Sequence, residues 1–85
     1  MQAKDQLFYV YIIRSVDNPT HHYTGYTRDI GKRLHAHNNG QSHHTSKYCP
    51  WFLETVISFR DEQKAKTFEL YLKSHSGRAF ATKHL

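Results

Sequence analysis

The run of residues 7–13 limits the possible folds of this chain more than any other feature of its sequence. It reads Leu-Phe-Tyr-Val-Tyr-Ile-Ile, so aromatic and aliphatic side chains occupy every position. Such residues favour a strand, and their alternation places apolar side chains on both of its faces. One face carries Phe8, Val10 and Ile12, and the other carries Tyr9, Tyr11 and Ile13. The sequence therefore predicts a strand that is covered on both sides.

A hairpin is predicted to follow this strand. The Asp-Asn-Pro sequence at residues 17–19 favours a turn, because the short polar side chains bond to the local backbone and proline fixes its own φ. Residues 20–26 then read as a second strand that pairs antiparallel with the first. This pairing would bring Tyr11 and Tyr23 into the same neighbourhood.

Helical spacing begins directly after the second strand. Thr27 or Asp29 can cap the helix, since a short side-chain oxygen satisfies a free N–H group of the first turn. Ile30 and Leu34 are four residues apart and can face a core together. The helix should end near Gly40, because glycine readily takes the left-handed conformation that follows many helices.

Polar side chains are concentrated in the same stretch. Arg33 and His37 are also four residues apart, so they lie on one adjoining face of the predicted helix. Tyr23 stands just before them, at the end of the preceding strand. A phenol, a guanidinium and an imidazole are thus expected close together, and the rest of the domain is predicted to be organised around residues 23–37.

The second half of the chain repeats the strand–helix order. After a polar loop at residues 41–50, residues 51–59 are predicted to form a third strand, again apolar on both faces. Asp61 is expected to cap a second long helix. Four residues of that helix follow the spacing of an apolar stripe: Ala65, Phe68, Glu69 and Leu72. The helix should end at residues 75–77, with a last short helical turn through Phe80.

The predicted fold class is α/β of the α+β type, a small three-stranded antiparallel sheet flanked by helices. The element order is strand–strand–helix–strand–helix, with the short helical turn last. The 85 residues are expected to form one domain, residues 1–85. A chain of this size buries a modest fraction of its surface, so we expect a single thin core layer.

Composition favours a polyanionic partner. There are 12 Lys and Arg residues against 7 Asp and Glu, a net charge of +5 with the histidines neutral. A small basic domain with 14% aromatic residues fits nucleic acid first, and the alternative is a soluble protein that happens to be basic. The single cysteine, Cys49, suits a reducing cytoplasm. No signal peptide or membrane-spanning run is recognisable, so we expect a cytoplasmic protein.

Glu69 has two interpretations. A carboxylate within an apolar stripe is costly to bury unless something pairs with it. It forms either an ordinary ion pair with Lys73, four residues on, or a site for Mg²⁺, which commonly uses one or two carboxylates and keeps its waters. Arg33 is likewise either a solvated helix residue or a bidentate phosphate ligand.

The remaining polar residues also have structural alternatives. Tyr11 and Tyr23 are either packing residues of the sheet or functional phenols. Zinc is disfavoured, because His35 and His37 are two residues apart and point in different directions on a helix.

Taken in order, the chain resembles the GIY-YIG nucleases along nearly its whole length. The first motif reads Tyr9-Val10-Tyr11, and the second reads Tyr23-Thr24-Gly25. The second continues into Gly-x-Thr-x-x-Ile-x-x-Arg-Leu at residues 25–34, and His-Asn-x-Gly follows at residues 37–40. Further matches are Pro50-Trp51, Glu69-x-x-Leu72-Lys73 and Ser76-Gly77-Arg78. The set is most similar to small single-domain bacterial members. Three departures, Tyr9, Val10 and Thr24, fall at positions that pack rather than react.

The resemblance implies hydrolysis of a DNA phosphodiester by in-line attack of water. It implies one cleft formed by Tyr11, Tyr23, Arg33, His37 and Glu69. Glu69 would hold one Mg²⁺ or Mn²⁺, and Arg33 would hold a non-bridging phosphate oxygen. One of the two tyrosines would accept the proton of water, and His37 would position the water or support a tyrosine.

Three functions are compatible with these residues. The first is a metal-dependent DNA endonuclease, the second a catalytically weak or inactive basic module that binds nucleic acid, and the third a structural domain with incidental polar residues. Lys32, Arg33, Lys47 and Arg78 lie in or near the motifs and are expected to contact DNA. The presence of Arg33 and Glu69 favours the endonuclease, since a module that only binds would be expected to have lost one of them.

Overall fold

The computed structural model describes residues 6–85 and confirms the predicted fold class. Three strands form one antiparallel sheet in the spatial order β2-β1-β3. The strands are β1 (Phe8–Ser15), β2 (His22–Thr27) and β3 (Trp51–Phe59). The helices are α1 (Ile30–Asn38), α2 (Glu62–Lys73) and α3 (His75–His84), and a short 3₁₀ helix, η2 (Ser46–Tyr48), precedes β3.

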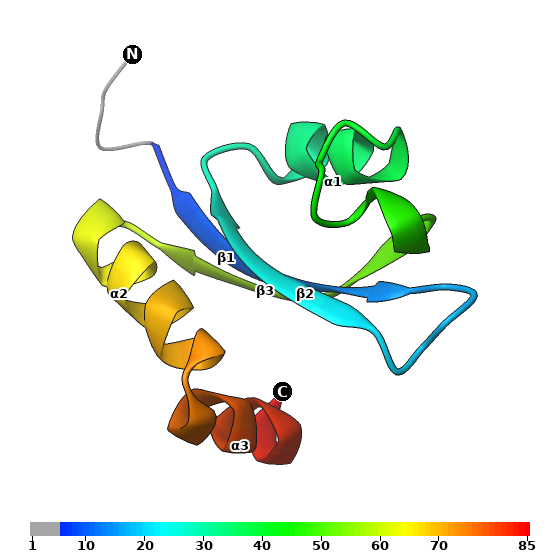
Figure 1. Cartoon of the computed structure of the whole chain (residues 1–85). Helices are drawn as coiled ribbons and strands as arrows, with labels where there is room; N and C mark the ends of the chain where they lie inside the picture. The colour runs from blue at the N-terminus through cyan, green and yellow to red at the C-terminus, as the bar shows by residue number, and fades with distance from the viewer. Residues whose placement is uncertain (1–5) are drawn as a thin grey trace.

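The central strand β1 is covered on both faces, as its sequence predicts. Figure 1 shows α1 on one side of the sheet and α2 and α3 on the other. Val10 packs with Ala65 and Leu72 on the α2 side, whereas Tyr11 and Ile13 belong to a separate cluster on the α1 side. The expectation of a single thin core layer is therefore wrong. Alternation along β1 divides the core into two clusters, one on each face of the sheet.

The first turn of α1 shows how the two candidate caps divide their roles. Asp29 is the cap, and its carboxylate accepts the backbone N–H of Lys32 at 3.0 Å. The hydroxyl of Thr27 instead accepts the backbone N–H of Asp29 at 3.1 Å. Ile30 and Leu34 pack into the core on the α1 side, as their spacing predicts.

The end of α1 is tied to the start of β3. The Asn38 side chain donates to the carbonyl of Trp51 at 3.1 Å and accepts its backbone N–H at 2.5 Å. Gly40 follows the helix with φ of +71°, the left-handed conformation expected there. The indole N–H of Trp51 donates to the carbonyl of Thr45 at 2.9 Å. These bonds fix the loop after α1 against both α1 and β3.

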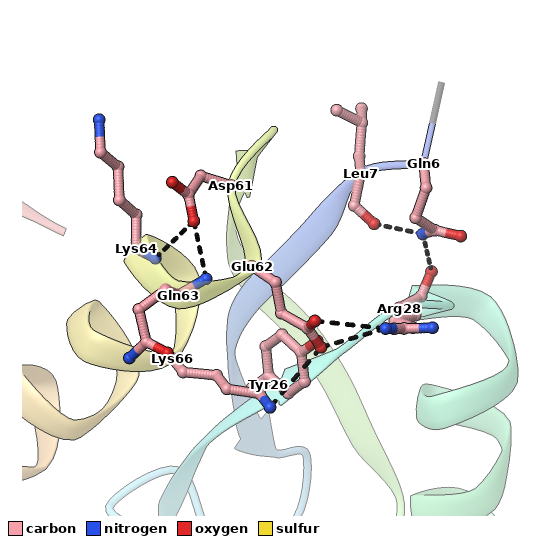
Figure 2. A network of polar contacts seen from close by, with 9 residues as sticks. All are labelled: Gln6, Leu7, Tyr26, Arg28, Asp61, Glu62, Gln63, Lys64 and Lys66. Atoms are coloured by element: carbon pink, nitrogen blue, oxygen red, sulfur yellow. Dashed lines mark hydrogen bonds and ion pairs between the residues drawn. The ribbon is translucent and has the colours of Figure 1, made fainter. Parts of the chain in front are cut away.

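A polar network fixes the start of α2 against β2 (Figure 2). Glu62 accepts the hydroxyl of Tyr26 at 2.5 Å and a guanidinium nitrogen of Arg28 at 3.3 Å. Lys66 pairs with the same carboxylate at 3.6 Å. Because Tyr26 and Tyr23 belong to one strand, the network also sets the position of α2 relative to Tyr23.

The last helix is longer than predicted. Instead of a short turn through Phe80, α3 is a ten-residue helix that ends at His84. Ser74 begins it, because its hydroxyl accepts the backbone N–H of Gly77 at 3.1 Å. A side chain on Gly77 would overlap the carbonyl of Tyr71, so α3 packs directly on the last turn of α2. The polar residues at this junction resemble the end of a helix, although they begin a new one.

Several apolar side chains reach the surface along β3, an edge strand. Phe52, Leu53 and Val56 are 37–44% exposed, although Trp51 at the start of the strand is buried. The strand is therefore apolar in sequence, but the rest of the domain covers its side chains only in part. Within residues 6–85 no helix is long and apolar enough to cross a membrane.

Candidate active site

The hydroxyl of Tyr11 lies at the centre of a buried polar cluster. His37 Nε2 is 2.8 Å from this oxygen, and Arg33 Nε donates to it at 3.3 Å. The other ring nitrogen of His37, Nδ1, is 2.6 Å from the hydroxyl of Thr45. Tyr11, His37 and Thr45 are at most 1% exposed. Residues from β1, α1 and the loop before η2 thus form one hydrogen-bonded chain.

The register of the sheet explains the position of the Tyr11 ring. Tyr11 is paired with Gly25 in β2, and this neighbour has no side chain. A Cβ atom on Gly25 would lie 2.5 Å from Tyr11 Cζ and closer still to the hydroxyl oxygen. The ring therefore lies directly over the backbone of β2. Arg33 and His37, one turn apart on α1, both reach its hydroxyl there.

Gly25→Ala is expected to displace Tyr11 while leaving the sheet intact. The added methyl group overlaps the phenol ring, so the ring must move away from His37 and Arg33. Overpacking of this kind reduces the free energy of unfolding by about 1–3 kcal/mol. Chemical denaturation measures this loss, and the NMR signal of the His37 ring reports the lost hydrogen bond.

Gly31→Ala is the matched control for this substitution. Its Cβ would have only a carboxylate oxygen of Asp29 within 4 Å, at 3.9 Å. Alanine in a helix is favoured over glycine by up to ~1 kcal/mol, so this variant should be as stable as the wild type or more so. An unchanged His37 signal in Gly25→Ala would contradict the close packing of Tyr11 on β2.

Tyr23 and Glu69 join the cluster from the open edge of β2. The ring centroids of Tyr23 and His37 are 5.4 Å apart, and Lys73 Nζ is 5.4 Å from the centroid of the Tyr23 ring. Lys73 also forms an ion pair with Glu69 at 2.5 Å, and the Glu69 side chain is 13% exposed. Since α2 covers the opposite face of the sheet, Lys73 reaches Tyr23 around the free edge of β2. The five residues proposed from the sequence thus lie in one continuous cluster: Tyr11, Tyr23, Arg33, His37 and Glu69.

Burial dominates the acid–base properties of the cluster. It raises the pKa of Tyr11 above its ordinary value, and the hydrogen bond and charge of Arg33 oppose this increase. Tyr23 and Glu69 raise the pKa of Tyr11 further. Burial, assisted by the charge of Arg33, lowers the pKa of His37 to about 4. At neutral pH the cluster therefore holds an uncharged phenol and an uncharged imidazole with one N–H.

The low pKa of His37 predicts a loss of stability in mild acid. The unfolded chain takes up this proton near pH 6.5, whereas the folded protein does so only near pH 4. The contribution to stability is complete above pH 6.5 and is lost as the pH falls toward 4. We expect a loss on the order of 1–3 kcal/mol in denaturant unfolding across this range. His37→Gln should lack this component, and identical pH dependence in the two proteins would contradict it.

A family model described as the GIY-YIG catalytic domain matches residues 7–83. The chain belongs to the GIY-YIG family. The match spans every strand and reaches into the last turn of α3. GIY-YIG membership places the chain in a family of nuclease domains.

Two GIY-YIG-type relatives carry the designation UPF0213. UPF0213 protein CPE1444 of Clostridium perfringens (strain 13 / Type A) is 36% identical over 66 residues, which cover 76% of this chain and 69% of that protein. The solution NMR structure of UPF0213 protein BH0048 from Bacillus halodurans has a TM-score of 0.54 and 28% identity. The similarity covers 91% of this chain and 83% of that one. Neither name states an activity, so the relatives support the family and the fold.

The GIY-YIG site of this chain offers a metal ion one carboxylate. Among residues 6–85 no three His, Cys, Asp or Glu side chains lie close enough together to form a metal cage. Glu69 alone fits a hard cation that keeps most of its waters, as Mg²⁺ does. Lys73 is paired with this carboxylate, so a metal ion would have to displace it. The donor set is thus compatible with Mg²⁺ or Mn²⁺ and lacks the ligands that zinc prefers.

The basic residues expected to contact DNA lie on two faces of the GIY-YIG domain. Lys32 in α1 and Lys47 in η2 are exposed on the α1 side, and Lys47 Nζ lies 5.6 Å from the centroid of the Tyr48 ring. Arg33 is half-buried between them and the core. Arg78 belongs to α3, on the opposite face of the sheet. The structure therefore groups Lys32, Arg33 and Lys47 and separates Arg78 from them.

A hollow of about 660 Å³ lies beside Arg78, and none of the five clustered residues lines it. Arg14 and Glu54 form part of its wall and are joined by two hydrogen bonds of 2.8 and 3.0 Å. Arg14 also donates to the carbonyl of Pro19 at 2.6 Å, so each of its three guanidinium nitrogens already has an acceptor. A carboxylate on the wall disfavours a phosphate ligand. The candidate active site is therefore the cluster around Tyr11.

Thr45 is the member of the cluster that sequence reasoning missed. It belongs to the polar stretch His-His-Thr-Ser-Lys, which predicts a loop and gives no hydroxyl a distinctive spacing. Its burial arises from contacts with the elements on either side of the loop, since its side chain contacts His37 and its carbonyl contacts Trp51. No local pattern carries this information.

Proposed function

We propose that this GIY-YIG domain is a metal-dependent endonuclease that hydrolyses phosphodiester bonds in DNA. The observation that supports it most is the convergence of Arg33 Nε and His37 Nε2 on the hydroxyl of Tyr11. Glu69 lies near enough to raise the pKa of that phenol. A proton acceptor, a cation for phosphate and a carboxylate for a metal ion are thus close together.

Arg33 has nitrogen atoms available for a phosphate group. Its Nε donates to Tyr11, whereas its two terminal nitrogens make no hydrogen bond within residues 6–85. A guanidinium can hold a phosphate through its terminal nitrogens while it remains bonded to the phenol. Its positive charge would stabilise the negative charge that develops on the phosphate oxygens.

Tyr11 is better placed than Tyr23 to accept the proton of water. It contacts both Arg33 and His37, whereas the Tyr23 hydroxyl makes no hydrogen bond in the described part of the chain. In the proposed reaction Tyr11 first loses its proton to solvent. The water oxygen then attacks phosphorus in line with the 3′ oxygen, and the proton of this water passes to the Tyr11 phenolate. The bond between phosphorus and the 3′ oxygen breaks. The 3′ oxygen takes a proton from solvent, which leaves a 5′-phosphate and a 3′-hydroxyl.

Glu69 is the residue that would hold Mg²⁺ or Mn²⁺. The bound ion would neutralise the scissile phosphate and stabilise the charge of the departing oxygen. Glu69 raises the pKa of Tyr11, so neutralising this carboxylate favours the phenolate. Lys73, which is 2.5 Å from the same carboxylate, would be released from it and could contact phosphate instead.

A second candidate function is a basic module that binds nucleic acid without cleaving it. The ion pair between Glu69 and Lys73 favours this alternative, because a carboxylate already neutralised by lysine does not require a metal ion. Both functions use the basic side chains on the α1 side. They differ in whether a bond is broken.

Incubation with DNA of defined structure distinguishes these functions. Nicked, branched, single-stranded and duplex DNA would each be incubated with the wild-type protein in Mg²⁺, in Mn²⁺ or in EDTA. We expect metal-dependent cleavage of at least one substrate, with 5′-phosphate ends. Binding without cleavage on every substrate would favour the binding module, and the absence of both would overturn both functions.

DNA binding should weaken steeply with added salt. The chain carries a net charge of +5, and each phosphate contacted contributes a slope of roughly 0.9 to the fall of log affinity with log salt. Lys32→Gln or Lys47→Gln should reduce the slope by about one unit. Arg78→Gln removes the same charge from the opposite face and should leave the slope unchanged. Fluorescence anisotropy measures these slopes. An affinity that does not change with salt would contradict the proposal that the protein binds nucleic acid.

A further inference from the structure

Two aromatic rings from distant parts of the chain stack on each other beside the candidate active site. The ring centroids of His21 and Tyr48 are 3.9 Å apart, and their planes differ by 15°. His21 lies in the turn between β1 and β2, and Tyr48 is the last residue of η2. Tyr48 also packs against the buried cluster of Tyr11, Ile13 and Trp51. The stacked pair is therefore continuous with the core on the α1 side, where the candidate site lies.

One face of the His21 ring has no aromatic partner. His21 is exposed, and within residues 6–85 its ring contacts no other ring than that of Tyr48. Its ring nitrogens make no hydrogen bond in the same part of the chain. Tyr48 covers one face of the imidazole, so the second face is available to another flat ring.

The backbone holds this pair in place. The N–H of His21 donates to the carbonyl of Asn18 at 2.8 Å, and its carbonyl accepts the N–H of Ser15 at 3.0 Å. The N–H of Val16 donates to the carbonyl of Pro50 at 3.0 Å, which joins the turn to the segment after η2. The ring contact is thus not the only link between the two segments. A surface fixed in this way loses little conformational freedom when it binds a ligand.

The surroundings of the pair match a nucleic-acid strand. Lys47 Nζ lies 5.6 Å from the centroid of the Tyr48 ring, so a cation for phosphate accompanies the rings. His21 lies two residues before Tyr23, and side chains alternate between the two faces of an extended strand. His21 and Tyr23 therefore point to the same face, whereas His22 between them lines the hollow on the opposite face. Proteins that bind single strands likewise combine aromatic rings for the bases with positive charge for the backbone.

We propose that the open face of His21 is a stacking platform for an unpaired base of the DNA substrate. Bases within a duplex are covered on both faces by their neighbours, so only an unpaired or terminal base can stack on a protein ring. The platform would therefore favour DNA with a single-stranded segment beside the cleavage site. The inference deepens the proposed function and rests on DNA as the substrate. Stacking does not require the bond-breaking step, so binding alone can test it.

Two oligonucleotides of equal length test the platform, one of thymidines and one of abasic sites. Both carry the same phosphates, and only the first has bases. We expect the wild type to bind the thymidine strand roughly 5- to 100-fold more tightly, the usual effect of one stacked base. His21→Ala should lose most of this preference, and His21→Phe, which keeps an aromatic ring, should retain it. Fluorescence anisotropy measures the affinities. No preference in the wild type, or an equal preference in His21→Ala, would overturn the proposal.

His22→Ala is the matched control. His22 is also exposed and is adjacent in the chain, but it makes no ring contact within residues 6–85. Its removal should leave both affinities at the wild-type values. Salt dependence separates stacking from charge, because His21→Ala should keep the wild-type slope, whereas Lys47→Gln should reduce it. A slope reduced in His21→Ala as much as in Lys47→Gln would assign His21 to phosphate contacts and overturn the platform.

The same measurements separate the platform from the endonuclease. A wild-type protein that prefers the thymidine strand through His21 but cleaves no DNA would overturn the endonuclease and leave the platform in place. A wild-type protein that cleaves DNA but binds the two strands equally would overturn the platform and leave the endonuclease. Absence of binding to every DNA would overturn both.

Discussion

Glu69→Gln should abolish DNA cleavage while DNA binding survives. The substitution keeps the size of the side chain and its place in α2, and it removes the one carboxylate of the cluster. A bound metal ion contributes several kcal/mol to the transition state, so the cleavage rate should fall by roughly 10³-fold or more. Binding depends on lysine and arginine side chains and should persist. Calorimetric titration with Mg²⁺ should show that metal binding is lost together with cleavage.

Glu62→Gln is the matched control on the same helix. Glu62 also pairs with a lysine four residues on, Lys66, but it contacts Tyr26 and Arg28 instead of the cluster around Tyr11. Its cleavage rate should remain near that of the wild type. Glu69→Gln itself should reduce stability by no more than ~1 kcal/mol, because the ion pair it breaks is partly exposed. Intact cleavage in Glu69→Gln, with Mg²⁺ still required, would assign the metal ion to a different residue.

Tyr11→Phe should reduce cleavage by roughly 10²- to 10⁴-fold, the usual contribution of a positioned proton acceptor. The ring stays in place over Gly25 and only the hydroxyl is removed. His37 and Arg33 lose their shared partner, so the free energy of unfolding should fall by about 1–3 kcal/mol. Cleavage under single-turnover conditions and chemical denaturation measure the two effects separately.

Two other tyrosines provide controls for this result. Tyr26→Phe also removes a hydrogen-bonded hydroxyl, but this hydroxyl donates to Glu62 on the other face of the sheet. The Tyr26→Phe variant should therefore cleave DNA at the wild-type rate. Tyr23→Phe should cause a smaller loss than Tyr11→Phe, because the Tyr23 hydroxyl has no hydrogen bond within residues 6–85. A large loss in Tyr23→Phe with normal cleavage in Tyr11→Phe would exchange the roles of the two tyrosines.

The parts of the fold that local patterns specify could be predicted. The apolar run at residues 7–13 gives a strand covered on both faces, and the Asp-Asn-Pro turn gives the hairpin. Asp61 caps α2, and Asp29 was one of two candidate caps for α1. Each of these features depends on residues within one turn or one strand of each other, so their physical causes are visible in a short stretch of sequence.

Features that depend on contacts between distant residues could not be predicted. The sequence does not show that α1 and α2 cover opposite faces of the sheet, and this arrangement divides the core in two. The sequence also does not predict the full length of α3, because the polar residues that begin this helix resemble the end of α2. In both cases the outcome depends on which face each helix packs against, and periodicity alone does not specify that.

The same distinction between local patterns and contacts in the folded domain applies to the candidate site. The four-residue spacing of Arg33 and His37 places both side chains on one face of α1, where they reach Tyr11. Thr45 carries no such signal, because a threonine in a polar loop becomes a buried hydrogen-bond partner of His37 only when Trp51 and His37 enclose it. An ion pair with Lys73 was one of the two interpretations of Glu69, but the contact of Lys73 with Tyr23 around the edge of β2 requires the assembled sheet.

Cleavage in water enriched in heavy oxygen tests the central claim most directly. Wild-type protein and the double variant Tyr11→Phe with Glu69→Gln would be purified identically and compared in Mg²⁺, under single-turnover conditions, on the DNA that the wild type cleaves best. The account predicts that only the wild type cuts the DNA and that one heavy oxygen enters each 5′-phosphate. Equal cleavage by both proteins would trace the activity to a contaminant or to another site. Products of wild-type cleavage without the heavy oxygen, or wild-type protein that binds every DNA substrate and cuts none, would contradict hydrolysis at Tyr11 and Glu69.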